Sequence, residues 1–404
     1  MKIGMPPSVV SKYYLYQAMR TFGFFWPVFT LFLLARDLSF TQIALLNSIS
    51  AGFVVVGEIP TGYIADRIGR RNSMIVSSVL YASSILGFAV AQSFAGFVIL
   101  WIVWAFAQTF RSGAGAAWLY ETLEDRLDES EYTRVRGRGG SVNKWLSAVM
   151  MLSAGPLYGV DQRLPFVAAG VLNAAAVVIL FTMPKTSAFD GENPSEETFS
   201  VVDALPLIRE QLSQPPLRSF VVYAAVFFGV LRAADEFIQP VAVNVAGVPV
   251  SAIGTLYAGF TAVSAVASYF AGDIEDMLTT RWALVGLTTF TAVALVVPAF
   301  LPVLALPMFF IMKSMNTVVH PIVSGYINDH AESLGRASLL SAASLVYALF
   351  RFVLQPVGGV VADRLSPLWG FAALGGLFII VAVVINATEA PAAETTSTAD
   401  QVFT

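Results

Sequence analysis

Long apolar stretches with almost no charged residues recur along the whole of this chain. A helix needs about 20 mostly apolar residues to cross the hydrocarbon core of a bilayer. Such stretches lie at residues 13–35, 42–65, 73–92, 95–119, 142–160, 164–183, 218–241, 250–271, 282–300, 303–326, 337–361 and 367–387. Charged residues make up only 12% of the chain, against about 25% in a soluble domain, and the mean hydropathy is +0.71. The sequence therefore predicts an all-α membrane protein with twelve transmembrane helices.

The longest polar break in the chain separates these stretches into two groups of six. Three short motifs recur in the same order in both groups: Gly62–Asp66 with Gly272–Asp276, Gly137–Arg138 with Gly335–Arg336, and Gly155–Pro156 with Gln355–Pro356. Internal repeats of this kind are known in secondary transporters. We therefore predict two pseudo-symmetric six-helix bundles, at 1–183 and 218–387, joined by a cytoplasmic linker at 184–217 and followed by a disordered cytoplasmic tail at 388–404.

Basic residues are distributed unequally between the two sides that this topology defines. With the N-terminus inside, the cytoplasmic segments hold fifteen lysines and arginines. The outer loops hold three, which are Arg36, Arg163 and Arg364. Because basic residues concentrate on the cytoplasmic side of membrane proteins, we predict a multi-pass protein of the cell (plasma) membrane with both termini in the cytoplasm.

Several classes of function find no support in the sequence. The chain has no cysteine and two histidines, so we expect no disulfide, no Cys-ligated metal and no His-rich metal site. No G-x-x-x-x-G-K loop is present, and no Ser/His/Asp or paired-carboxylate pattern indicates an enzyme. We expect no cofactor and no nucleic-acid partner, and a monomer in the lipid bilayer. A non-transporting receptor or sensor is the alternative from another class, but the longest loop is too short for a folded domain.

The segment between the second and third stretches carries a family motif. Residues 57–71 read Gly-Glu-Ile-Pro-Thr-Gly-Tyr-Ile-Ala-Asp-Arg-Ile-Gly-Arg-Arg. This run resembles the signature of the major facilitator superfamily: a Gly, an Asp four residues later, then Arg, Gly and two basic residues. The resemblance covers essentially the whole chain. It implies a secondary transporter whose helices 1, 2, 4, 5, 7, 8, 10 and 11 surround a central cavity, with the other four outside.

Two shorter matches concern the fourth and fifth stretches. Arg111 with Gly115 resembles a helix 4 pattern of the family, although Ala114 stands where the family usually has Gln. Gly155, Pro156 and Gly159 resemble the core of the helix 5 signature of drug/proton antiporters. The alternative is structural, because glycine and proline in a membrane helix also bend it and let neighbouring helices pack.

Nine ionisable residues lie inside the predicted membrane stretches: Arg20, Glu58, Arg111, Arg232, Asp235, Glu236, Lys313, His320 and Arg351. A charge at the bilayer centre costs at least about 2.5–3.5 kcal/mol on insertion scales. Each is therefore a candidate functional residue. None lies in the interior of the third, sixth, ninth or twelfth stretch, which are the outer helices in the fold that the resemblance implies.

We expect two roles among these residues. The predicted substrate-binding residues are Arg20, Arg111, Lys313, Arg351, Trp26 and Phe110, and the predicted proton carriers are Glu58, Asp235, Glu236 and His320, with Glu58 first. Five cations and three anions give the cavity an excess of +2, which favours an anionic substrate. The structural alternatives are an ion pair confined to Arg232, Asp235 and Glu236, snorkelling of Arg20, an arginine partner for Glu58, and a packing role for His320.

The family signature also predicts a latch between the two halves on the cytoplasmic side. Gly62 would allow close approach of a helix, and Asp66 would meet the positive N-terminal end of a helix in the second half. The resemblance identifies that helix as the one beginning near Gly335. The other predicted latch residues are Arg67, Gly69, Arg70 and Arg71, whose main acidic partner would be Glu121. Alternatively, the three arginines only fix the orientation of the chain.

These observations favour one function over its alternatives. We expect a proton-coupled secondary active transporter of a small amphipathic or anionic molecule, working by alternating access. Export, as an antiporter, is the first expectation, because of the Gly155–Pro156 element and the aromatic residues of the first and fourth stretches. Proton-coupled uptake and uncoupled facilitation are the alternatives.

Overall fold

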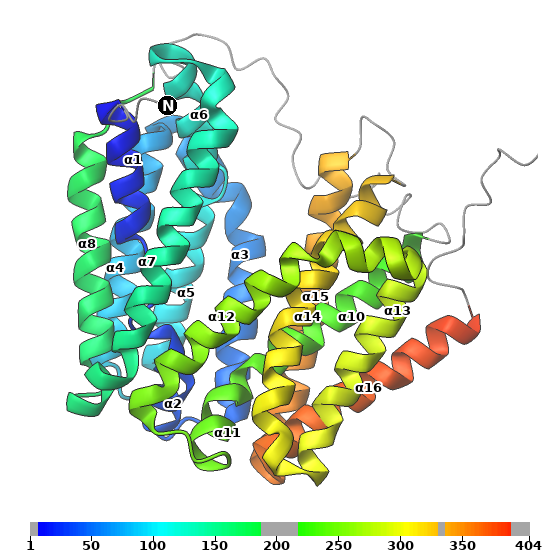
Figure 1. Cartoon of the computed structure of the whole chain (residues 1–404). Helices are drawn as coiled ribbons and strands as arrows, with labels where there is room; N and C mark the ends of the chain where they lie inside the picture. The colour runs from blue at the N-terminus through cyan, green and yellow to red at the C-terminus, as the bar shows by residue number, and fades with distance from the viewer. Residues whose placement is uncertain (1–6, 187–216, 330–335, 389–404) are drawn as a thin grey trace, which may run out of the picture. The chain divides into compact units, whose positions relative to one another are not determined.

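The computed structural model describes residues 7–186, 217–329 and 336–388, and these residues form helices joined by short connections (Figure 1). Within them, ten helices are long and apolar enough to cross a membrane. The predicted all-α membrane class is therefore confirmed. The predicted linker and tail, and Gly335 at the start of the predicted latch helix, lie outside the described residues, apart from a few at their edges.

Two of the twelve predicted stretches are not among these ten helices. Residues 13–35 do not form one continuous α-helix: α1 (Ser8–Met19) ends early, and a 3₁₀ turn at Trp26–Val28 leads into the short α2 (Phe29–Leu34). Residues 142–160 belong to α7 (Tyr132–Val160), whose first half carries Arg134, Arg136 and Arg138. The first stretch is thus divided between helices that are too short to cross a membrane, and α7 is not apolar enough over a membrane-spanning length.

The described helices fall into two compact units. Unit 1 lies within Met1–Thr198 and Gln239–Gly259, and unit 2 within Phe199–Ile238 and Phe260–Thr404. Unit 1 contains α1, α2 and α7 together with α3 (Phe40–Ile68), α4 (Arg70–Val90), α5 (Phe94–Arg111), α6 (Ala114–Arg126) and α8 (Leu164–Thr182). It also includes most of α11 (Ile238–Asn244) and the start of α12 (Ile253–Tyr269), which come later in the chain. Unit 2 contains α10 (Leu217–Ala234), α13 (Ala271–Phe300), α14 (Ala305–Asp329), α15 (Arg336–Arg364) and α16 (Pro367–Thr388).

A glutamine from the second half of the sequence completes a helix start in unit 1. The first backbone N–H groups of a helix have no partner within that helix. The side-chain oxygen of Gln239 accepts hydrogen bonds from the N–H groups of Thr30 at 2.8 Å and Leu31 at 3.3 Å, at the start of α2. Its amide nitrogen donates to the carbonyl of Trp26 at 2.9 Å. These bonds tie Gln239 to α2 and satisfy two of the N–H groups that the helix itself leaves without a partner.

Two glycines let α7 approach the start of α12 closely. A Cβ atom on Gly155 would collide with the carbonyl of Val250 and lie 2.7 Å from that of Ser251. A Cβ atom on Gly254 would collide with the carbonyl of Met151. By contrast, a Cβ atom on Gly159 would meet nothing within 4 Å. Gly155 therefore has a packing role within unit 1, as small residues at membrane helix interfaces commonly do.

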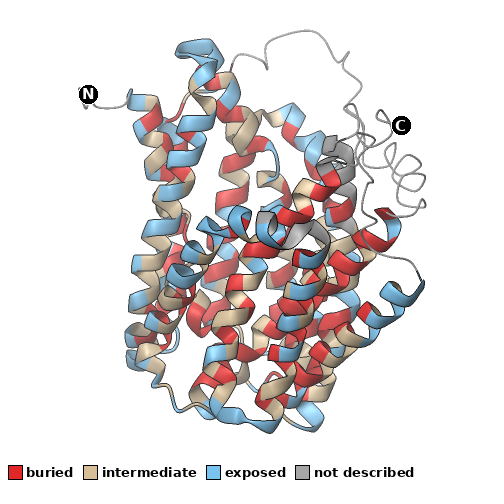
Figure 2. Ribbon diagram, turned by 45° about the vertical axis from the view of Figure 1, so that its right-hand side comes forward, coloured by how far each residue is buried: buried red, intermediate tan, exposed pale blue. Residues whose placement is uncertain are grey.

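Aromatic side chains fill the core of unit 1. Phe25, Phe88 and Phe166 are almost fully buried, and the rings of Phe29 and Trp101 stack with their centroids 5.2 Å apart. Apolar side chains also cover much of the outer surface, where pale blue marks exposed residues in Figure 2; Ile99 is 63% exposed. Exposed apolar surface on this scale needs lipid to cover it.

The glycine contacts generate a prediction about stability. Gly155→Ala places a methyl group against the backbone at Val250 and Ser251, so we expect it to lower the free energy of unfolding by about 1–3 kcal/mol. Gly159→Ala in the same helix is the matched control, and should be neutral or slightly stabilising because alanine has the higher helix propensity. Thermal unfolding of the purified proteins in detergent measures both; equal midpoints would contradict the packing role.

Candidate functional site

Two arginines stand where membrane helices are interrupted in unit 1. Arg20 is the residue that ends α1, and Arg111 is the last residue of α5. After Arg111 the chain turns through Ser112 and Gly113, which has φ +74°, before α6 begins. A positive side chain at a helix C-terminus is favoured by the helix dipole. The helix dipole is therefore one reason why arginine stands at both positions.

Polar side chains of α7 and α8 bind the backbone at the first interruption, the one next to Arg20. Asn143 of α7 donates to the carbonyls of Gln17 at 2.8 Å and Arg20 at 3.2 Å. Asn173 of α8 donates to the carbonyl of Thr21 at 3.3 Å, and the Thr21 hydroxyl lies 2.6 Å from that of Ser147. Backbone that leaves the helix inside a membrane needs such partners. The backbone around Arg20 is therefore fixed by two neighbouring helices.

Each arginine lies against a buried tyrosine. The Arg20 guanidinium carbon is 5.8 Å from the centre of the Tyr16 ring, and that of Arg111 is 4.7 Å from the centre of the Tyr81 ring. The charge of Arg20 also acts on Arg111 and on Tyr81, so the four side chains form one group, which we call the arginine–tyrosine cluster. Cation–π contact stabilises an arginine without neutralising it.

The charge of the arginine–tyrosine cluster is not balanced by an acid. Among the described residues, no carboxylate forms an ion pair with Arg20 or Arg111. The Nε atom of Arg20 and the hydroxyl of Tyr16 are buried and have no hydrogen-bond partner there. Two guanidinium groups whose charges act on each other, one of them with an unpaired buried donor, attract an oxyanion. The cluster therefore has the chemistry of an anion site.

Unit 2 places its charges around one carboxylate. Asp235 lies in a 3₁₀ turn, Asp235–Phe237, that interrupts the helical segment between α10 and α11. Arg232 donates to Asp235 at 3.3 Å, and Lys313 of α14 forms an ion pair with the other carboxylate oxygen. The Asp235 side chain is only 12% exposed. Lys313, which was predicted as a substrate contact, pairs with Asp235 within unit 2.

A polar stripe on α15 faces the same group of charges. Arg351 feels the charges of Arg232 and Glu236. Tyr347 and Gln355 lie one turn before and one turn after it, and each of the three side chains has a buried polar atom with no partner in the described structure. Gln355 is 2% exposed. Sequence analysis missed Tyr347 and Gln355, although their spacing of four residues from Arg351 was a usable signal.

The remaining predicted proton carriers are more exposed. Glu58 on α3 is exposed, and among the described residues it makes neither a hydrogen bond nor an ion pair through its side chain. His320 on α14 is also exposed, with its ring 5.7 Å from that of Phe228. Phe228 in turn lies 5.4 Å from the ring of Tyr347. The structure thus gives Glu58 no arginine partner within the described part of unit 1 and gives His320 an aromatic neighbour.

The aromatic side chains predicted to contact substrate have different surroundings. Trp26 is half-buried, and its ring lies 6.3 Å from that of Phe29 in the aromatic core. Phe110 is half-buried next to Arg111 in α5. Tyr16 and Tyr81, which touch the two arginines, were not predicted. Tyr16 stands four residues before Arg20, so helical spacing pointed to it, but nothing in the sequence connected Tyr81 with Arg111.

The signature residues form contacts at the junction of α3 and α4. Arg70 forms ion pairs with Asp66 at 2.8 Å and with Glu121 of α6 at 3.6 Å. Gly69 joins the two helices with φ +85°, a conformation that favours glycine. The Arg67 guanidinium lies 4.3 Å from the Tyr63 ring centre, and Arg71 donates to the carbonyl of Met183 at 3.0 Å. A Cβ atom on Gly62 would meet nothing within 4 Å.

Comparison with known proteins identifies the family. The chain is 24% identical over 391 residues to an uncharacterized MFS-type transporter, YxaM, of Bacillus subtilis (strain 168), and the match covers 93% of each chain. The nucleoside transporter NupG has a similar fold, with a TM-score of 0.76, 13% identity and coverage of 94% of this chain and 97% of that one. A peptide transporter, POT, solved in complex with sulfate, has a TM-score of 0.70 at 12% identity, covering 96% and 95%. The family model of the Major Facilitator Superfamily matches residues 15–345. This chain therefore belongs to the major facilitator superfamily and is a membrane transporter of that family.

Proposed function

We propose that this protein is a proton-coupled secondary transporter of a small amphipathic molecule with an anionic group, and that it exports this molecule by alternating access. The observation that carries the proposal is the arginine–tyrosine cluster, in which Arg20 and Arg111 have no acidic partner among the described residues. Both arginines lie at helix interruptions, where transporters often bind their substrates.

Electrostatics supports an anionic cargo over a cationic one. Arg20 and Arg111 carry like charges that act on each other. A carboxylate, phosphate or sulfonate would relieve this repulsion, and a guanidinium presents paired donors that match such groups. The tyrosine and phenylalanine rings nearby supply apolar surface for the rest of an amphipathic molecule. Arg20 and Arg111 would repel a lipophilic cation.

Asp235 is the best-supported proton carrier in unit 2. Arg232 and Lys313 both form ion pairs with Asp235, and protonation of Asp235 would remove the negative charge that attracts them. A carboxylate whose neighbours change between two access states has a different proton affinity in each state. Glu58, the first candidate from the sequence, is exposed in this structure, and its environment in the other access state would have to differ to make it a carrier.

The direction of transport is supported by resemblance only. Gly155, Pro156 and Gly159 resemble an antiporter element, but Gly155 also has the packing role described above. Proton-coupled uptake and uncoupled facilitation are therefore the alternative functions. Proteoliposomes with an imposed pH gradient distinguish the three: an exporter takes up its substrate into inside-out vesicles when they are acid inside, a symporter moves it with the proton, and a facilitator ignores the gradient.

The first prediction concerns the cargo. Arg111→Ala should weaken binding of the transported anion about tenfold or more, because a charge-assisted hydrogen bond contributes about 1.5–3 kcal/mol. Arg111→Lys should bind more weakly than the native protein, since lysine lacks the planar fork. Arg134→Ala is the control, because Arg134 is exposed and pairs with Glu131. A monovalent lipophilic cation as the best substrate, with unchanged transport in Arg111→Ala, would refute an anionic cargo.

The second prediction concerns coupling. Asp235→Asn cannot exchange a proton, so we expect it to lose gradient-driven transport while substrate exchange without a gradient continues. Glu58→Gln tests the other candidate in the same assay. Glu131→Gln, at an exposed carboxylate, is the control. If neither Asp235→Asn nor Glu58→Gln alters the pH dependence of transport, both residues are excluded from the coupling mechanism.

The third prediction concerns the proposed cytoplasmic latch. Asp66 and Glu121 both pair with Arg70, at 2.8 and 3.6 Å. These pairs lie within unit 1 and, being exposed, contribute only about 0–1 kcal/mol each. Asp66 can therefore exchange them for the proposed contact with a helix of the second half, which must reopen in every cycle. Asp66→Asn should shift the protein toward the inward-open state and slow transport without lowering its thermal stability. Distances between spin labels on the cytoplasmic ends of the two halves report the shift. Unchanged distances in Asp66→Asn and in Arg70→Ala would contradict the latch.

A further inference from the structure

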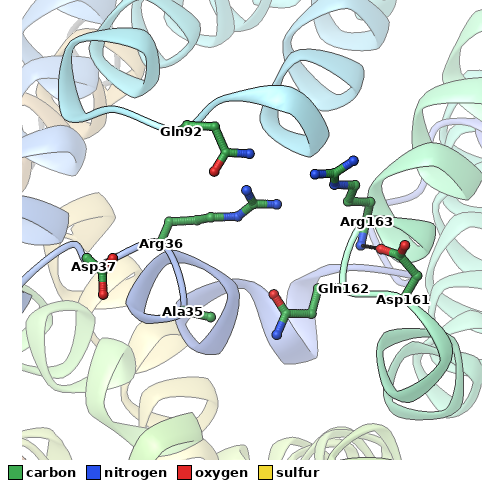
Figure 3. A pocket seen from close by; sticks show the side chains of 7 residues that line it. All are labelled: Ala35, Arg36, Asp37, Gln92, Asp161, Gln162 and Arg163. Carbon is green, nitrogen blue, oxygen red and sulfur yellow. Dashed lines mark hydrogen bonds between the residues drawn. The ribbon is translucent and has the colours of Figure 1, made fainter.

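Three connections of unit 1 border an open hollow on the surface at one end of its helices. The connections are residues 35–39 between α2 and α3, 91–93 between α4 and α5, and 161–163 between α7 and α8. The hollow has a volume of about 560 Å³, and its lining includes Arg36, Gln92, Gln162 and Arg163 (Figure 3). Under the orientation predicted from the basic residues, this is the outer end of the unit.

Two arginines and an amide converge in this hollow. In Figure 3 the guanidinium groups of Arg36 and Arg163 point toward each other, and the amide of Gln92 points into the same space. The Arg36 guanidinium carbon lies 4.8 Å from the Phe32 ring centre, which holds the side chain in place. The Nε atom of Arg36 is buried and has no hydrogen-bond partner among the described residues.

The two aspartates of the hollow do not neutralise these arginines directly. Asp161 accepts the backbone N–H of Arg163 at 2.8 Å, so part of its hydrogen-bonding capacity serves the turn. Asp37 lies on the far side of the Arg36 backbone, and the Arg36 side chain extends away from it in Figure 3. Within the described ranges, neither aspartate forms an ion pair with Arg36 or Arg163. The four charges that line the hollow therefore sum to zero, but the guanidinium groups, rather than the carboxylates, face the space between the two arginines.

The sequence shows how unusual this concentration of charge is. The predicted outer loops contain three basic residues, Arg36, Arg163 and Arg364, and two of the three meet in the hollow although they lie 127 positions apart (163 − 36 = 127). Basic residues on the cytoplasmic side set the orientation of a membrane protein, so Arg36 and Arg163 are not needed on the outer side for this purpose. Orientation therefore gives no reason for placing two arginines around one hollow.

We propose that this hollow is a second oxyanion site, in which Arg36 and Arg163 bind a phosphate or carboxylate group and Gln92 donates a further hydrogen bond. Two guanidinium groups facing one space suit an anion with several oxygens, because each offers parallel donors. The site is separate from the arginine–tyrosine cluster and does not depend on the proposed cargo. Its ligand is either a soluble anion or the phosphate of a lipid headgroup.

The test measures thermal unfolding of the full chain in a sugar-headed detergent, which contains no phosphate. Inorganic phosphate is titrated in one arm and phosphatidylglycerol in the other. We expect a rise of the unfolding midpoint in at least one arm. In the double variant Arg36→Gln/Arg163→Gln, the concentration needed for half of that rise should increase about tenfold or more, as expected for loss of charge-assisted hydrogen bonds.

Two controls make the result specific to this hollow. Arg364→Gln removes the third outer arginine, which does not line the hollow, and should respond as the native protein does. Both arms are repeated in an Arg111→Ala background, which removes a cation of the proposed substrate site, so that phosphate binding there does not contribute and the response that remains reports on the hollow. A response to phosphate identifies a soluble anion as the ligand, and a response to phosphatidylglycerol alone identifies a headgroup. A double variant that responds like the native protein, or no response in either arm, overturns the proposal.

Discussion

A helix that stops inside a bilayer leaves backbone N–H and C=O groups that water cannot reach, and the rest of this structure depends on how those groups are satisfied. At the end of α1, the amide side chains of Asn143 and Asn173 donate to the carbonyls of Gln17, Arg20 and Thr21. At the start of α2, Gln239 takes up two N–H groups from far along the chain. These amide side chains make a broken first helix possible in lipid, and they lock α1, α7, α8 and residues 239–259 into one unit.

The interruptions also decide where charge sits. Arg20, Arg111 and Asp235 each stand at a point where regular helix ends or changes to a 3₁₀ turn. A helix C-terminus favours a cation there. The two units solve the cost of buried charge differently: unit 1 lays its arginines on tyrosine rings and leaves them without an acid among the described residues, whereas unit 2 surrounds Asp235 with cations. One unit is therefore suited to hold an anion and the other to exchange a proton, which is the division of labour that the proposed function uses.

Close packing of α7 against α12 supports the interruption at Arg20. Gly155 and Gly254 bring the backbones of α7 and α12 together, and the same stretch of α7 carries Asn143 and Ser147 toward the interruption at Arg20. Gly155, which resembles part of an antiporter motif, thus also has a steric role in helix packing. At the far end of α7, the turn into α8 brings Arg163 beside Arg36, so one helix contributes to the packing, to the interruption and to the outer hollow.

The sequence by itself determined the class of fold and ten of the membrane stretches, and it supplied the list of ionisable residues within them. It could do so because lipid excludes unpaired polar groups so strongly that composition and spacing record the exclusion. It also pointed to residues one helical turn apart, such as Tyr16 with Arg20. Only the tertiary structure decided which of the other charges meet: it set Lys313 on Asp235, Tyr81 on Arg111 and Arg36 opposite Arg163. It also revealed the broken first helix and the reach of Gln239 to α2. These contacts join residues on different helices, and a one-dimensional pattern of hydrophobicity carries no information about which helix faces of a bundle come together.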